Sequence, residues 1–201
     1  MLKALAGELD MQTRDVDLKD VPLVMENAEA GDYRVVMWSR GDYAWPWLIP
    51  MYDYTDEGIV DLMYTKEFRQ ALSYAINREQ QNEIAHLGLG KPRQFALSAE
   101  SPEFQSEEGK KVFEEWSQSY AAYDPEQANA LLDGLGLMDV DGDGFRERAD
   151  GTPLELIVDV PSDGDKLTID AMDMIQQQWE AVGLKTTLNL APWSVIDQRA
   201  A

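Results

Sequence analysis

Apolar residues along the chain follow a helical spacing in some segments and form short continuous runs in others. In segment 65–76, Lys, Glu, Arg and Gln cover one helical face. The apolar positions share the opposite face: Phe68, Ala71, Leu72, Ala75 and Ile76. This pattern predicts an amphipathic helix packed on a core. Asn77 is suited to cap a second helix at 78–87, which Gly88 would end.

The last third of the chain alternates between strand and helix patterns. Segments 154–160 and 184–190 are apolar runs typical of strands, and segment 166–182 between them has the apolar spacing of a helix. A strand, a helix and a strand of these lengths predict a βαβ unit with parallel strands. Asp124 followed by Pro125 predicts the start of a further helix before this unit.

The remaining segments are less regular. Segment 17–30 is expected to form a short helix, followed by a strand at 33–38. Segment 39–64 has neither the apolar period of a helix nor that of a strand, and it is expected to be a loop with at most one strand. Segment 89–120 is expected to wrap the surface, with a helix around 110–118. At 201 residues, the chain is expected to form a single α/β domain over 1–201.

Composition narrows the classes of partner. The formal net charge is −21, from 38 acidic and 17 basic residues, which disfavours nucleic acid and anionic membranes as partners. The absence of cysteine excludes disulfides, thiolate metal sites and a cysteine nucleophile. The first ten residues have no apolar run long enough for a signal peptide or a membrane span. Residues from 194 onward start another helix at the end of the chain, so we expect an excised domain.

An acidic loop at 139–150 has the spacing of an EF-hand calcium loop, with Gly144 at the position of the sharp turn. The candidate metal ligands are the side chains or backbone oxygens of Asp139, Asp141, Asp143, Phe145, Glu147 and Asp150. Asp150 replaces the longer Glu at the last position, and a strand instead of a helix is expected after the loop. A structural Ca²⁺ and a solvated acidic turn both remain open, and no other cofactor is required.

Aromatic residues gather between positions 38 and 54 and are candidates for the lining of a ligand cleft: Trp38, Trp45, Trp47, Tyr52 and Tyr54. Packing in a core or at an interface between lobes is the alternative. His86 is the only histidine, and no nucleophile is paired with a base in the sequence, so we assign no catalytic residue.

Three stretches together resemble the extracytoplasmic solute-binding proteins of family 5, the oligopeptide and dipeptide type. They are Phe68-Arg-Gln-Ala-Leu-Ser-Tyr-Ala-Ile-Asn-Arg78, Tyr123-Asp-Pro-Glu-Gln-Ala-Asn-Ala-Leu-Leu-Asp133 with Gly136, and Trp179-Glu-Ala-Val-Gly183 before a strand. The resemblance implies a mixed β-sheet flanked by helices, as one lobe of a periplasmic-binding-protein-like fold of type II, cluster C. The lobe would be the second large, C-terminal one.

The resemblance also implies a function. Family members capture oligopeptides outside the membrane by closing two lobes on them, and they present the ligand to the permease of an ABC importer without breaking a bond. We therefore expect an extracytoplasmic, monomeric binding protein that is not an enzyme, with an oligopeptide or oligosaccharide as ligand. A calcium-stabilised interaction module of the dockerin type is the alternative, and a hydrolase with an acidic pair comes third.

Overall fold

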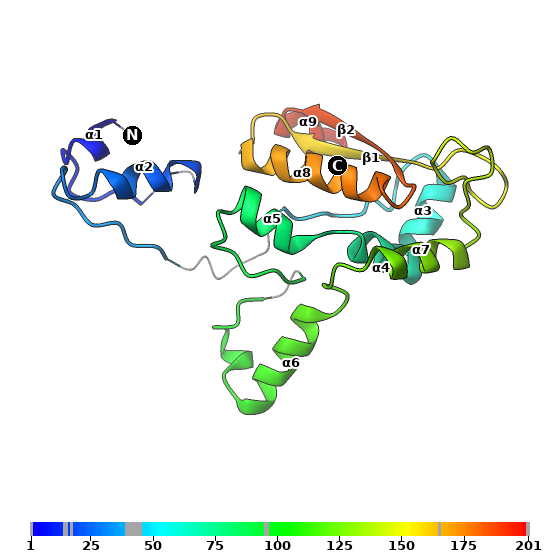
Figure 1. Ribbon diagram of the computed structural model, residues 1–201, viewed down its shortest axis with the longest axis horizontal. Helices are drawn as coiled ribbons and strands as arrows, with labels where there is room; N and C mark the ends of the chain where they lie inside the picture. Colours follow the sequence, from blue (N-terminus) through cyan, green and yellow to red (C-terminus); the bar gives the residue numbers. More distant parts are fainter. Residues whose placement is uncertain are drawn as a thin grey trace. The chain divides into compact units, whose positions relative to one another are not determined.

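The computed structural model describes residues 2–13, 16, 18–38, 46–94, 97–164 and 166–199. The chain divides into two compact units, residues 1–41 and 42–201 (Figure 1). All described strands lie in the second unit. That residues 1–201 fold as a single domain, the C-terminal lobe fragment of a larger protein, stays a prediction.

The first unit is a small helical assembly. It contains α1 (Leu2–Leu5), the 3₁₀ turn η1 (Leu18–Asp20) and α2 (Val21–Glu26). Val21 and Val24 are its buried apolar side chains, and the Tyr33 hydroxyl donates to the Val24 carbonyl oxygen at 2.7 Å. The helix expected at 17–30 is therefore present but ends earlier, at Glu26.

The strand expected at 33–38 is absent. Its residues have no regular secondary structure and are mostly exposed, and Trp38 keeps 74% of its surface accessible. A strand needs a neighbour to receive its hydrogen bonds, and the described part of the first unit offers none. The prediction of a strand from the apolar run at 33–38 was therefore wrong.

The second unit contains the expected βαβ arrangement. Strands β1 (Glu155–Pro161) and β2 (Lys185–Ala191) pair in parallel, with Leu156 opposite Thr186, and α8 (Lys166–Glu180) connects them. Figure 1 shows α8 lying along the two strands, and its inward face buries Met172, Ile175 and Trp179. The α/β fold class is confirmed, and the sheet has two parallel strands in the described part of the chain.

A layer of helices completes this core. The predicted helices are confirmed as α4 (Lys66–Tyr74), α5 (Arg78–Ala85) and α7 (Pro125–Gly134). Phe68 of α4 and Leu132 of α7 are fully buried in the same cluster as the inward residues of α8. The Trp179 indole donates to the Leu72 carbonyl oxygen at 3.0 Å, which fastens α8 to α4 across the core.

Helix α3 (Glu57–Tyr64) lies in the segment expected to be a loop. Its start is capped by Asp56, whose carboxylate accepts hydrogen bonds from the backbone of Gly58 and Ile59 at 3.0 and 3.2 Å. Ile59, Leu62 and Met63 of this helix pack on the core. The Pro-rich and aromatic stretch before Asp56 obscured this short amphipathic pattern.

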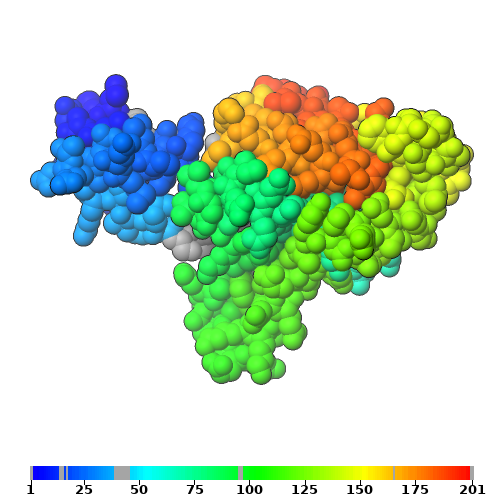
Figure 2. Space-filling view, in the orientation of Figure 1, coloured from blue at the N-terminus to red at the C-terminus, as the bar shows by residue number. Residues whose placement is uncertain are grey.

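Residues 97–119 form an arm, which contains the 3₁₀ turn η2 (Pro102–Phe104) and α6 (Glu107–Gln118). The Phe104 ring contacts the rings of Phe113 and Trp116, with centroid distances of 5.2 and 6.2 Å. Figure 2 shows the arm in green, projecting from the second unit. Helix α9 (Trp193–Arg199) follows β2, and among the described residues no helix is long and apolar enough to cross a membrane.

Candidate functional site

The aromatic candidates are distributed over both units and are exposed wherever the structure describes them. Trp38 belongs to the first unit, and Trp45 lies outside the described residues. Trp47, Tyr52 and Tyr54 belong to the second unit, with 51, 44 and 43% of their surfaces accessible. These three side chains are therefore not buried in the core of the second unit, and their place in a ligand cleft stays a prediction.

Tyr64 at the end of α3 joins this group, although the sequence did not single it out. Its ring lies 4.6 Å from that of Tyr52, with an angle of 31° between the planes, and 64% of its surface is accessible. The neighbouring Leu48 packs on the core instead. Recognising α3 would have revealed Tyr64, since its ring is presented at the helix end toward the preceding loop.

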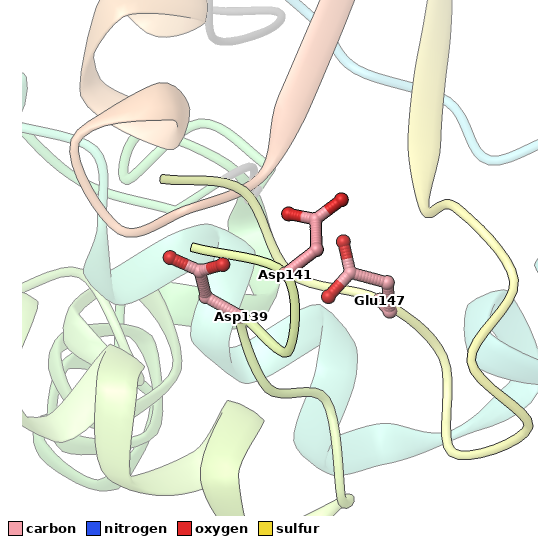
Figure 3. Close-up of side chains that lie close together, drawn as sticks. All are labelled: Asp139, Asp141 and Glu147. Carbon is pink, nitrogen blue, oxygen red and sulfur yellow. The ribbon is translucent and has the colours of Figure 1, made fainter. Parts of the chain in front are cut away.

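Part of the acidic loop converges. Asp139, Asp141 and Glu147 each offer one carboxylate oxygen, and these three oxygens lie within 4.8 Å of one another. Figure 3 shows the three side chains. Glu147 is buried, and its carboxylate accepts the Val140 amide at 2.7 Å, whereas Asp139 and Asp141 are exposed. Oxygen ligands at such spacing suit a hard cation such as Ca²⁺, so the calcium prediction stays open.

The other predicted ligands have local roles. Asp143 accepts the backbone amide of Phe145 at 2.8 Å, and Asp150 accepts the amide and hydroxyl of Thr152 at 3.0 and 2.6 Å. The hydrogen bonds from Thr152 lower the pKa of Asp150 from its ordinary value. The loop also leads from α7 into β1, not into a second helix as in an EF-hand. The structure thus groups three of the six predicted ligands.

An ion pair links the acidic loop to α3. Both Arg148 terminal nitrogens donate to the Asp56 carboxylate, at 2.9 and 2.6 Å. This hydrogen bonding holds the pKa of Asp56 below its ordinary value and raises that of Arg148. A Cβ on Gly58 would lie 2.7 Å from an Arg148 terminal nitrogen, so a larger residue at this position would displace the guanidinium from the first turn of α3. The loop therefore helps to fix the helix that carries Tyr64.

Arg146 anchors the same loop to the core on its other side. Its guanidinium donates to the carbonyl oxygens of Val182 and Leu137 and to the side chains of Asp133 and Asn129. Only 11% of the Arg146 side chain is accessible. No local pattern in the sequence indicates this role of Arg146, because its four acceptors lie up to 36 positions away. His86 is half-buried directly after α5.

Comparison with known proteins identifies the family. The model of the bacterial extracellular solute-binding proteins, family 5 Middle, matches residues 2–201. No curated protein matches the chain.

Solved structures agree with this match. An oligopeptide-binding protein OppA is 34% identical over 98% of this chain, with a TM-score of 0.73, and the chain spans 30% of that protein. A lactococcal OppA, solved in its closed conformation with an endogenous peptide, is 25% identical, with a TM-score of 0.55 over 68% of this chain and 24% of its own. A periplasmic oligopeptide-binding protein of Thermotoga maritima, solved with mannohexaose, shares the fold at 23% identity, with a TM-score of 0.58 over 96% of this chain and 34% of its own. The chain therefore belongs to the bacterial extracellular solute-binding proteins of family 5.

Proposed function

We propose that this chain is part of the substrate-binding component of an ABC importer. That component captures an oligopeptide or an oligosaccharide outside the membrane and delivers it to the permease. The observation that carries the proposal is the 34% identity to an oligopeptide-binding protein over 98% of the chain, together with the family match. The chain spans 30% of that relative, so it would supply one part of the ligand cleft.

The exposed rings of the second unit support a binding role. Trp47, Tyr52 and Tyr64 present flat apolar faces with few rotatable bonds, so stacking on a ligand costs little conformational entropy. Sugar rings and peptide side chains both stack on such faces. The solved relatives hold both classes of ligand, a peptide in the lactococcal protein and mannohexaose in the Thermotoga protein. Either class is therefore a candidate ligand here.

Capture by closure of lobes requires rigid α/β bodies and a cleft that excludes water, and it requires no nucleophile. The buried cluster around Phe68, Leu132 and Ile175 gives the second unit the rigid core that such a body needs. The family match favours this function over the dockerin-type module. A dockerin would need the acidic loop twice, and the chain contains it once.

Calorimetric titration of the full-length parent protein tests the proposal. We expect binding of either a mixture of pentapeptides or mannohexaose, with no turnover of chromogenic glycosides or peptides. In the parent, Tyr52→Ala should weaken binding by about fivefold, because losing a stacked aromatic ring costs about 1 kcal/mol. Tyr123→Ala removes a ring with 49% of its surface accessible and serves as the matched control. The proposal would be contradicted if the parent bound neither ligand class, or if it turned over a chromogenic substrate.

A further inference from the structure

A hollow with a volume of about 440 Å³ lies between α4 and the end of the arm. Lys66, Arg69 and Gln70 of α4 form one wall, and Trp116 and Tyr120 form the other. None of its lining residues belongs to the aromatic group at 47–64 or to the acidic loop. It is therefore a separate feature from the proposed ligand cleft.

The hollow is basic in a strongly acidic chain. Among the residues that the structure describes, its lining includes Lys66 and Arg69 and no carboxylate, although the chain carries 38 acidic residues. Within the described residues neither cation forms an ion pair. Lys66 lies 5.8 Å from the centre of the Tyr120 ring, and one Arg69 nitrogen donates to the Met63 carbonyl oxygen. The remaining N–H groups of Lys66 and Arg69 can therefore donate hydrogen bonds to an anion.

Hydrogen bonds fix the floor of the hollow. The Ser73 hydroxyl donates to the Tyr120 carbonyl oxygen at 2.8 Å, and the Gln94 side-chain amide donates to the same oxygen at 3.2 Å and to the Ser73 hydroxyl oxygen at 2.5 Å. Arg78, which does not line the hollow, also donates to the Ser73 hydroxyl oxygen, at 2.8 Å. Tyr120 itself has a positive φ of 56°, a conformation that costs energy for a tyrosine. The hydrogen bonds hold its ring against Lys66 in spite of this cost.

We propose that this hollow binds the carboxylate group of an organic acid, either a free small acid or the carboxyl end of a peptide. Arg69 would donate through the open side of its fork and Lys66 would add a point charge. The rings of Trp116 and Tyr120 would contact the apolar part of the acid, which favours an organic anion over an inorganic one. The proposal does not rest on the proposed transport function.

The test is a titration of the full chain with succinate, inorganic phosphate and two acetylated dileucines, one with a free carboxyl end and one amidated. Backbone amide shifts in nuclear magnetic resonance spectra report binding at constant ionic strength. We expect saturable shifts at residues 66–73 and 116–120 with succinate, with the free-acid peptide, or with both, which identifies the source of the carboxylate. Phosphate and the amidated peptide should bind at least about tenfold more weakly.

Charge variants complete the test. The double substitution Lys66→Gln, Arg69→Gln should weaken carboxylate binding by about tenfold or more. The pair Lys91→Gln, Lys111→Gln changes the net charge equally at exposed sites outside the hollow and should leave binding unchanged. Because Arg69 also contacts the backbone, Lys66→Glu at an exposed position provides a second variant that leaves this contact in place. Equal loss in the control pair, equally tight binding of phosphate, or no saturable shift would overturn the proposal.

Discussion

Arg146 is the side chain whose replacement we expect to reveal most about the second unit. It joins the acidic loop to α7 and to the turn before β2 through four acceptors, two of which are backbone carbonyl oxygens. Arg146→Met keeps a similar apolar stem and removes all donors. The carbonyl oxygens of Val182 and Leu137 would then lose a partner in a largely buried place, because only 11% of the Arg146 side chain is accessible.

The magnitude follows from these contacts. Each buried group left without a partner costs about 1–3 kcal/mol, but Asp133 can return to water because 53% of its side chain is accessible. We therefore expect the free energy of unfolding to fall by about 3 kcal/mol. For a chain of this size, such a loss lowers the melting temperature by about 6–12 °C. Arg146→Lys retains the charge without the planar fork and should recover about half of the loss.

Urea unfolding followed by circular dichroism measures this loss. Arg199→Met is the matched control, because Arg199 pairs with Asp159 at 2.8 Å with side chains that are 50 and 32% accessible. An exposed ion pair of this kind contributes less than about 1 kcal/mol. If Arg146→Met cost no more than Arg199→Met, the view of Arg146 as the anchor of the loop would be refuted.

Three further predictions concern the loop and its neighbours. Millimolar Ca²⁺ should raise the melting temperature, and Asp141→Asn should abolish this rise. Asp150→Asn should leave the rise unchanged, because Asp150 lies outside the converging group. If the unaltered chain showed no rise, the calcium prediction would be wrong. The pKa of Asp56 is depressed by Arg148, so its stabilising contribution is present above its ordinary pKa of 3.8 and is lost as the pH falls through the lower folded value. Asp56→Asn should therefore flatten the acid limb of a plot of stability against pH, and an unchanged limb would contradict the coupling. Gly183→Ala should lower the free energy of unfolding by about 1–2 kcal/mol in urea titrations, because Gly183 has a φ of +80° and its Cβ would lie 3.0 Å from the Arg146 stem; a neutral effect would contradict this.

Sequence patterns predicted the elements whose signals are local. The helix at 66–74, the strand at 155–161 and the connecting helix at 166–180 each carry a periodic apolar face or run within a few turns. Two predictions failed because a local pattern does not show the surroundings of a segment. Segment 33–38 has strand composition but no described neighbour to pair with, and α3 begins with a cap that follows an irregular aromatic stretch.

The candidate site was predictable only in part. The acidic loop could be recognised because its candidate ligands lie within twelve residues at a characteristic spacing. That Asp139, Asp141 and Glu147 converge without Asp150 depends on how the backbone turns. The Tyr52 and Tyr64 pair and the four acceptors of Arg146 join residues separated by turns and helices. No spacing rule connects such residues, since their proximity is set by the packing of the core.

A hydrogen bond at the base of the arm has a consequence for how the second unit unfolds locally. The backbone amide of Gln94, just before the arm, donates to the carbonyl oxygen of Ser117 in the last turn of α6 at 2.7 Å, so the two ends of the arm are joined to each other. The part of the arm between these ends can therefore unfold locally while this junction and the core persist. Hydrogen exchange should accordingly divide the unit into two cooperative parts, with fast amides in α6 and slow amides in α8, β1 and β2.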